Sequence, residues 1–309
     1  MAIAAPSTPW ASPMLVDRSR LHIALQRSGR LSDLSRDLLR ESGLRIEAGK
    51  NSLSARAANF PADLMFVRDD DIPTFVTDGA CELGIVGQNV LEEFALGSNE
   101  RGFDVLAELG FGQCSLRIAA PERLSYDGAQ SLSGQRIATS YPRLLRRFLD
   151  ERKVDAEVVQ MKGAVELAPR LEIAPYICDL VSTGATLEAN GLRPVETVLK
   201  SQAVLIRTRK PLDEEREAIA GQLLSRIDGV LATKESKYIM LNASEEALER
   251  ITSLLPGAEA PTILPLHGRP GHFAVHAVCQ ESVFWETLQK LKGAGASAIL
   301  VVPIEKMML

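Results

Sequence analysis

The sequence predicts an α/β protein built from two lobes that enclose a cleft, followed by a smaller βαββαβ domain of the ferredoxin type. Three observations support this fold class. The chain has 309 residues, about twice the typical single-domain length. Short apolar runs alternate with helical patterns in two consecutive series. The final part, about 75 residues and therefore of ordinary small-domain size, follows the order βαββαβ.

The first series begins with a short apolar strand at 21–26 (LHIALQ). A polar, glycine-containing loop leads into a helix whose leucines recur at helical spacing, and Gly43 ends it. The pattern returns as a strand at 63–68, a helix opened by DDDIP, a strand at 82–87 and the helical NVLEEFAL. This alternation predicts a largely parallel sheet covered by helices. His22, alone in an apolar strand, is predicted to be a core residue with a polar partner.

The second series follows two extended runs, DVLAELGF and CSLRIAAP, which we expect to cross between the lobes. It comprises QRIATS, the helix YPRLLRRFLDERK, the strand AEVVQ, the short helix AVELAPR and the strand YICDLV. The strands PVETVLK and SQAVLIRT are predicted to return to the first lobe. A cleft between two lobes is the usual place for a ligand.

The C-terminal series begins after a helix at 211–228. Glycine and proline mark its joints, which predicts strands at 237–243, 262–266, 272–279 and 297–304, with helices at 244–255 and 282–292. The domain boundaries that follow are a flexible tail at 1–17, lobe I at 18–105 and 191–230, lobe II at 106–190, and the βαββαβ domain at 231–309.

Composition excludes several classes of protein. A formal charge of −5 and a pI near 5.6 disfavour a nucleic-acid binder that relies on a basic surface. The four cysteines are too far apart in sequence for a short-spaced zinc framework. The N-terminal segment lacks the features of a secretory signal and no run has the length of a membrane span, so we expect a cytoplasmic protein without a membrane partner.

The segment YICDLVSTGATLEANG, residues 176–191, is the most informative part of the sequence. A strand leads into small and hydroxylated residues, and a helix begins after them. Backbone amides, hydroxyls and the helix dipole could together bind a phosphate. The alternative is a Ser/Thr N-cap on an ordinary helix. Asp179, inside the apolar strand, could accept hydrogen bonds from ribose hydroxyls.

DLVSTGATLEANGL resembles the phosphoribosyl pyrophosphate (PRPP) loop of the ATP phosphoribosyltransferase family, which opens histidine biosynthesis. Further motifs resemble the same family in the same order, so that the similarity runs from about Leu21 to Met307. They are ALQRSGRL, RDDDIPTFVTDGACELGIVGQNVLEE, GQRIATSYPRLLRRFLD, LPGAEAPTILPL and VFWETLQKLKGAGASAILVVPIEKM.

The resemblance implies the long form of the family. Its catalytic core has two lobes of the periplasmic-binding-protein type (type II), and an ACT-like regulatory domain follows. It implies the condensation of ATP with PRPP to N1-(5-phosphoribosyl)-ATP and pyrophosphate, with Mg2+ required. It also implies inhibition by L-histidine and a homo-hexamer, with dimers as an alternative, that needs no separate regulatory subunit.

The resemblance also implies roles for individual residues of lobe II. Asp179 holds the ribose, and Glu166 lies near the ribose or nucleotide, unless it is a solvated helix residue. Tyr141 stacks on a base, or else packs against the following helix. The 5-phosphate is held by backbone amides and hydroxyls of Ser182, Thr183, Gly184, Ala185, Thr186 and Leu187.

In lobe I, a loop after the first strand could clamp phosphates with its guanidinium groups. It consists of Arg27, Ser28, Gly29 and Arg30. Many family members carry Lys at the position of Arg27, which keeps the charge but changes the geometry. In the acidic run at 69–71, Asp71 is predicted to be a helix N-cap. Asp70 is the candidate for a substrate or magnesium contact.

Two other functions share parts of this architecture. A solute-binding protein has a two-lobed cleft, but it carries an export signal. A ligand-sensing regulator can carry an ACT-like domain, but it has a helix-turn-helix at one end. We find neither feature in the sequence, and a phosphate loop joined to a βαββαβ domain favours the enzyme.

Overall fold

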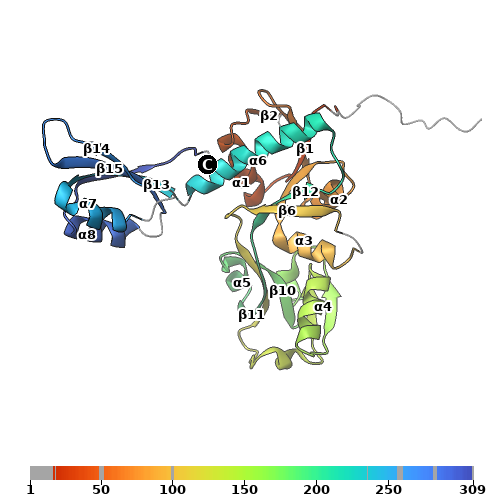
Figure 1. The fold of residues 1–309 in the computed structure, drawn as a ribbon. Coiled ribbons are helices and arrows are strands. Elements are labelled where there is room, and N and C mark those ends of the chain that lie inside the picture. The colour runs from red at the N-terminus through yellow and green to blue at the C-terminus, as the bar shows by residue number, and fades with distance from the viewer. Residues whose placement is uncertain are drawn as a thin grey trace, which may run out of the picture. The chain divides into compact units, whose positions relative to one another are not determined.

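We describe a computed structural model that covers residues 17, 19–48, 52–98, 101–234, 236–255, 260–280 and 284–307 (Figure 1). The tail predicted at 1–17 lies outside these residues except for Asp17, which accepts a hydrogen bond from Ser19 Oγ and pairs with Arg56. The chain divides into two compact units. One comprises Met1–Arg40 and Leu44–Ala220, and the other Glu41–Gly43 and Gly221–Leu309.

The first sheet of the larger unit confirms the predicted strand and helix series. Its order is β2 (Ile46–Ala48), β3 (Ser54–Ala57), β4 (Ala62–Val67), β1 (Leu21–Gln26), β5 (Leu83–Gly87), β12 (Ala203–Thr208) and β6 (Phe103–Glu108). The central trio β4, β1 and β5 is parallel, while β2, β3, β12 and β6 pair antiparallel at its two sides. The sheet is therefore mixed rather than largely parallel. The helices that follow β1, β4 and β5 are α1 (Arg30–Glu41), α2 (Ile72–Thr77) and α3 (Gln88–Ala95).

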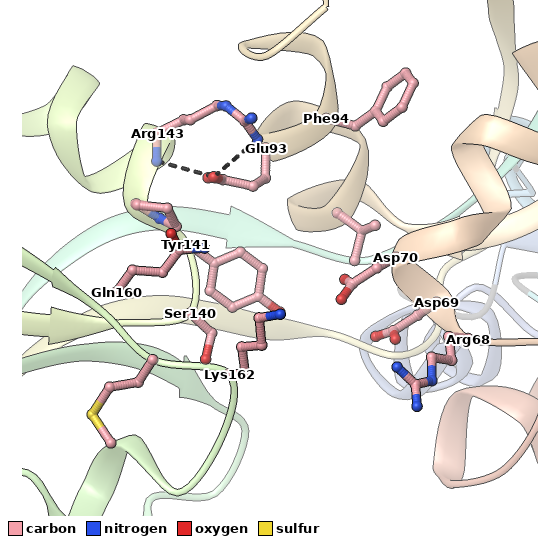
Figure 2. Close-up of a pocket in the computed structure, with 13 residues that line it drawn as sticks. Arg68, Asp69, Asp70, Glu93, Phe94, Ser140, Tyr141, Arg143, Gln160 and Lys162 are labelled. Carbon is pink, nitrogen blue, oxygen red and sulfur yellow. Dashed lines mark hydrogen bonds and ion pairs between the residues drawn. The ribbon is translucent and has the colours of Figure 1, made fainter.

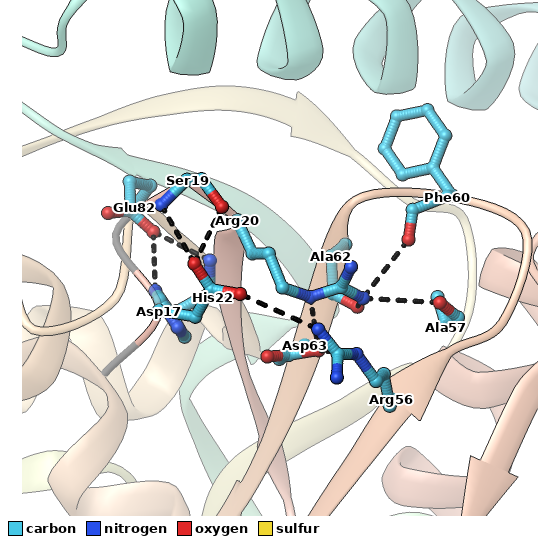
Figure 3. Close-up of polar contacts among 10 residues, drawn as sticks. All are labelled: Asp17, Ser19, Arg20, His22, Arg56, Ala57, Phe60, Ala62, Asp63 and Glu82. Carbon is cyan, nitrogen blue, oxygen red and sulfur yellow. Dashed lines mark hydrogen bonds and ion pairs between the residues drawn. The ribbon is translucent and has the colours of Figure 1, made fainter. Parts of the chain in front are cut away.

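Polar contacts fix the start of β1 (Figure 3). The Arg20 guanidinium pairs with Asp63 at 2.8 Å and donates to the backbone carbonyls of Ala57, Phe60 and Ala62. His22 is buried, as predicted, and its backbone N–H donates to Glu82 Oε2 at 2.6 Å. Glu82, also buried, accepts a second hydrogen bond from the Arg216 guanidinium at 2.8 Å.

The second sheet forms lobe II. Its order is β11 (Leu192–Ser201), β7 (Cys114–Pro121), β10 (Tyr176–Val181), β8 (Arg136–Thr139) and β9 (Glu157–Gln160). The helix α4 (Pro142–Glu151) packs on it through Leu144, Leu145 and Phe148. Together these apolar side chains give lobe II a core of its own.

The predicted return of PVETVLK to lobe I is wrong. These residues lie in β11, which pairs antiparallel with β7 from Leu192 to Ser201. The chain crosses back at Gln202, between β11 and β12, and the first crossing is the segment 109–113 between β6 and β7. Only Gln202 separates β11 from β12, so the composition does not change where the chain leaves lobe II. The predicted boundary between lobe II and lobe I, at 190/191, therefore lies about ten residues before the observed crossing.

The helix α6 (Glu214–Lys234) is longer than predicted and runs from the larger unit into the smaller. The backbone N–H of Arg216 donates to Asp213 Oδ1 at 2.9 Å, which caps its start. The boundary predicted at 230/231 therefore falls inside a continuous helix.

Among the helices that the structure describes, none combines the length and the apolar character that a membrane span requires.

The smaller unit confirms the predicted βαββαβ order. It contains β13 (Ser236–Ser244), α7 (Glu245–Ser253), β14 (Thr262–Pro265), β15 (His272–Gln280), α8 (Phe284–Gly293) and β16 (Ser297–Pro303). The sheet order is β14-β15-β13-β16, antiparallel throughout, as in ferredoxin-like domains. Ile239, Leu241, Val275, Ile251 and Leu291 form its core.

Candidate active site

The candidate residues lie at the carboxyl ends of strands, where α/β sheets commonly bind ligands. Strands β1 and β4 of the first sheet lead into residues 27–30 and 68–71. Strands β8, β9 and β10 of the second lead into 140–141, 161–162 and 182–187. Residues 68–70 of lobe I and 140–143 and 160–162 of lobe II line a cavity of about 530 Å³, within the usual size of small-molecule sites. Figure 2 shows Asp69 and Asp70 on one side and Ser140 and Tyr141 on the other.

The acidic side of the cavity is a turn of 3-10 helix, Asp69–Asp71. Asp70, the predicted substrate or magnesium contact, lines the cavity, and so does Asp69, to which the sequence gave no role. Burial, then the charges of Asp69 and Asp71, raise the pKa of Asp70. Asp71 occupies the N-cap position of α2, but its side chain makes no capping hydrogen bond to any described residue, so its predicted capping role is wrong.

Tyr141 packs against the following helix, as the alternative interpretation predicts, while its stacking on a base stays a prediction. Its half-buried ring packs against the lobe II core, and it lines the cavity. Its hydroxyl accepts a hydrogen bond from Asn89 Nδ2 at 3.0 Å. Burial, then the charges of Asp69 and Asp179, raise the pKa of the phenol, so Tyr141 is neutral and close to both carboxylates.

Asp179 and Glu166 are neighbours. Asp179 is half-buried at the end of β10, and its Oδ1 accepts a hydrogen bond from the Leu180 N–H at 2.8 Å. Burial raises the pKa of this carboxyl, and the charge of Glu166 adds to the shift. Glu166 lies in the 3-10 helix Val165–Leu167 and is half-buried, which disfavours the solvated-helix interpretation.

The loop after β10 is not built as an ordinary Ser/Thr cap. The helix α5 (Ala185–Ala189) begins after Gly184, whose φ of 86° is left-handed and suits glycine. Within the described chain no side chain caps α5, so the N-cap alternative fails. Ser182, Thr183 and Thr186 are exposed, while Leu187 is buried and anchors the loop to the lobe II core.

The lobe I loop meets the lobe II loop at a second cavity of about 240 Å³. Arg30, the first residue of α1, lines this cavity together with Asp69 and Ser182. Arg27 and Ser28 are exposed in the same loop, and Gly29 has a left-handed φ of 93°. Arg30 and Ser182 are far apart in sequence, so their shared cavity could not be predicted from local pattern.

Several residues of the cleft had no signal in the sequence. The helix α3 contributes Asn89, which is buried and exchanges hydrogen bonds with Ser201. It also contributes Glu93, whose carboxylate accepts hydrogen bonds from the backbone N–H groups of Arg143 and Leu144. In the sequence, NVLEE indicated only a helix, because the pattern does not say which second helix it faces.

The cleft offers oxygen ligands for a divalent cation only in part. Within the described residues there is no group of three or more His, Cys, Asp or Glu side chains placed to hold a metal ion. Asp69 and Asp70 nevertheless line one cavity together. Mg2+ is commonly held by one or two carboxylates, with water and substrate phosphates completing its shell, and these residues fit that mode.

The comparisons of sequence agree on one family, and a solved structure shares the fold. A family model described as ATP phosphoribosyltransferase matches residues 68–229, and a model described as HisG, C-terminal domain matches residues 233–306. The ATP phosphoribosyltransferase of Maricaulis maris (strain MCS10) is 54% identical over 291 residues, covering 94% of this chain and 99% of that protein. The solved ATP phosphoribosyl transferase (HisG:HisZ) complex from Thermotoga maritima is similar in fold, with a TM-score of 0.55 and 23% identity over 67% of this chain and 98% of that one.

Proposed function

The chain belongs to the ATP phosphoribosyltransferase family, and from that premise we propose how its cleft binds the two substrates and aligns them. The enzyme condenses ATP with PRPP to N1-(5-phosphoribosyl)-ATP and pyrophosphate, the first step of histidine biosynthesis. Family membership decides for the enzyme over the solute-binding and ligand-sensing alternatives.

PRPP binds, in our proposal, between the two loops that share the smaller cavity. Backbone amides and hydroxyls of 182–187 hold the 5-phosphate, and Asp179 accepts hydrogen bonds from the ribose hydroxyls. The single observation that carries this proposal is that Arg30 and Ser182, from opposite lobes, line one cavity beside Asp69. Arg27, Ser28 and Gly29 extend the same loop, and Arg27 and Arg30 neutralise charge on the leaving pyrophosphate.

ATP binds in the larger cavity, with its base against the exposed part of the Tyr141 ring. Adenine N1 attacks the anomeric carbon of PRPP with inversion, so that an N–C bond forms as the C–O bond to pyrophosphate breaks. No covalent enzyme intermediate is needed. The chain's residues act by aligning the two reacting atoms and by placing charges around the developing cation and the departing anion. Asp179 and Glu166 lie close enough to each other to share the second task.

Enzymes of this family use a metal ion, and we propose Mg2+ for this chain. Asp69 and Asp70 would hold it together with substrate phosphates, because both line the larger cavity. When bound, the ion would supply positive charge to the pyrophosphate oxygens.

A pyrophosphate-release assay tests the proposed function. Purified full-length protein supplied with ATP, PRPP and Mg2+ is expected to release pyrophosphate and form a phosphoribosyl adduct at adenine N1. Removal of the cation with EDTA is expected to abolish turnover, and added Mg2+ to restore it. Folded protein that releases no pyrophosphate under these conditions would contradict the function. Turnover that is unaffected by EDTA would contradict only the Mg2+ proposal.

We also propose the regulation and the assembly of this chain from its membership of the family. The C-terminal ACT-like domain would bind L-histidine and inhibit turnover, in a cytoplasmic homo-hexamer, with a dimer as the alternative assembly. The T. maritima protein was solved as a complex with HisZ. Its match to this chain covers 98% of the T. maritima chain but only 67% of this one. The extra C-terminal domain supports the proposal that no separate regulatory subunit is needed.

Mass measurement by light scattering checks the assembly. The 33.6 kDa chain is expected to have the mass of a hexamer in solution, and the mass of a dimer would favour the alternative assembly. A monomer at all concentrations would contradict this. The same samples, assayed with and without histidine, test the feedback separately, because turnover unchanged by histidine would remove inhibition and leave catalysis intact.

A further inference from the structure

The helices α3 and α4 hold the two lobes together along one side of the cleft. The α3 residue Asn89 donates to Tyr141 Oη, as described above. One turn further on, Glu92 pairs with Arg147 of α4 at 2.7 Å. Glu93 accepts hydrogen bonds from the Arg143 N–H at 3.0 Å and the Leu144 N–H at 2.9 Å. We refer to the contacts of Asn89 and Glu93 as the α3–α4 clasp; the Glu92–Arg147 pair joins the same helices away from the start of α4.

Within the clasp, Glu93 supplies what α4 lacks at its own start. The first N–H groups of a helix have no partner inside the helix and need an acceptor. Tyr141 occupies the N-cap position, and within the described chain no side chain local to α4 provides the cap. Both Glu93 carboxylate oxygens fill that role from the other lobe, and the negative charge lies at the positive end of the helix dipole. The Glu93 side chain is 13% exposed, so water screens the contact little.

The position of the cap matters because of what precedes it. Ser140 and Tyr141 lie immediately before α4 and line the larger cavity, on the side opposite Asp69 and Asp70 (Figure 2). Glu93 lines the same cavity from lobe I. Whatever fixes the start of α4 relative to α3 therefore fixes the width of the cavity. A reaction that depends on aligning two bound substrates is sensitive to that width.

We propose that Glu93 is a positioning residue of the transfer reaction, which caps α4 across the cleft and so holds the Ser140–Tyr141 wall at the distance that ATP needs. The proposal rests on the function proposed for this cleft. Glu93 does not itself touch the reacting atoms. Replacing Glu93 is therefore expected to raise KM for ATP and not to lower the amount of folded enzyme.

The experiment compares Glu93→Ala and Glu93→Gln with Glu92→Ala. The control residue is adjacent, and its carboxylate also binds α4, but through the Arg147 side chain and not at the helix start. Kinetics are measured well below the unfolding transition of each variant, with ATP and PRPP varied separately. Glu93→Ala is expected to raise KM for ATP by about tenfold. Glu93→Gln, which keeps one acceptor oxygen, should give a smaller rise, and Glu92→Ala a change within about twofold.

Amide hydrogen exchange reports the cap without reference to activity. The Arg143 and Leu144 N–H groups are expected to exchange faster in Glu93→Ala than in the wild type, and unchanged in Glu92→Ala. A loss of folded enzyme would lower kcat but leave KM alone, so a merely structural role predicts a different result. Unchanged exchange, or KM for ATP unchanged in Glu93→Ala, overturns the positioning role. If the wild-type enzyme does not turn over, the proposed function is wrong, and the role of Glu93 in that reaction is wrong with it.

Discussion

Replacing Asp179 with alanine is expected to lower kcat/KM for PRPP by about 10²- to 10³-fold, because in the proposed binding mode it removes the charge beside the ribose as the ribose becomes cationic. Asp179→Asn, which keeps the shape and one acceptor oxygen, should lose nearly as much. Pyrophosphate release with each substrate varied measures the effect. Glu188→Gln is the matched control, since Glu188 is exposed on α5 beside the same loop. Near-normal activity in Asp179→Ala would mean that the PRPP loop is wrongly assigned.

Replacement of Asp179 by alanine or asparagine should leave the fold intact. Burial, then Glu166, raise the pKa of Asp179, so the folded protein holds the ionised carboxyl less readily than the unfolded chain does. At neutral pH that ionised group lowers stability, and the penalty shrinks as pH falls below the raised pKa and is gone below the ordinary value of 3.8. Asp179→Asn removes the penalty at neutral pH, so its melting temperature should equal or exceed that of the wild type. A site residue that lowers stability is common where function requires it.

Replacing Glu82 with alanine is expected to lower stability by about 3 kcal/mol and the melting temperature of the catalytic core by roughly 10 °C. Glu82 is 2% exposed and accepts hydrogen bonds from the His22 N–H and the Arg216 guanidinium. Its loss leaves a buried amide without an acceptor and removes one of the two carboxylates that contact Arg216. Thermal unfolding followed by circular dichroism measures the change. Asp213→Asn is the control, because the exposed Asp213 is the other carboxylate on Arg216 and should have a much smaller effect.

The effect of Glu82 should also depend on pH. Burial alone would raise the pKa of this carboxyl, but hydrogen bonds from His22 hold it below its ordinary value of 4.5. A lowered folded pKa means that the contribution is complete above the ordinary value and is lost as pH falls through the folded one. The difference in melting temperature between the wild type and Glu82→Gln should therefore be larger at about pH 7 than at about pH 3. An equal difference at both would contradict the ionised state assigned to Glu82.

The sequence predicted the elements of the fold better than their assignment to sheets. Alternating apolar runs and helical spacing located β1, α1 and the whole βαββαβ unit, because burial imposes those periods on the residues themselves. The same patterns placed β11 in the wrong lobe. Its residues are apolar enough for either sheet, and only pairing with β7 decides between them. Strand pairing is a long-range contact that local sequence does not record.

The site divides in the same way. The loop at 182–187 and Asp179 could be proposed from the sequence because they are contiguous and their residue types together suggest phosphate and ribose binding. Asp69, Asn89 and Glu93 could not, since each gains its place from a partner that is distant in sequence. For Glu93 that partner is the start of α4, fifty residues away. Asp71 shows the opposite error, because an acidic residue in the N-cap position satisfied the pattern without making the hydrogen bond.

The opening prediction of two lobes and a βαββαβ domain was determined by the sequence alone, since length, apolar periodicity and turn residues are properties of single segments. The family resemblance was likewise carried by contiguous motifs. Only the tertiary structure decided where the chain crosses between lobes, which residues from the two lobes share a cavity, and how α3 caps α4. These depend on contacts between segments far apart in the chain, and such contacts form only when the whole core packs.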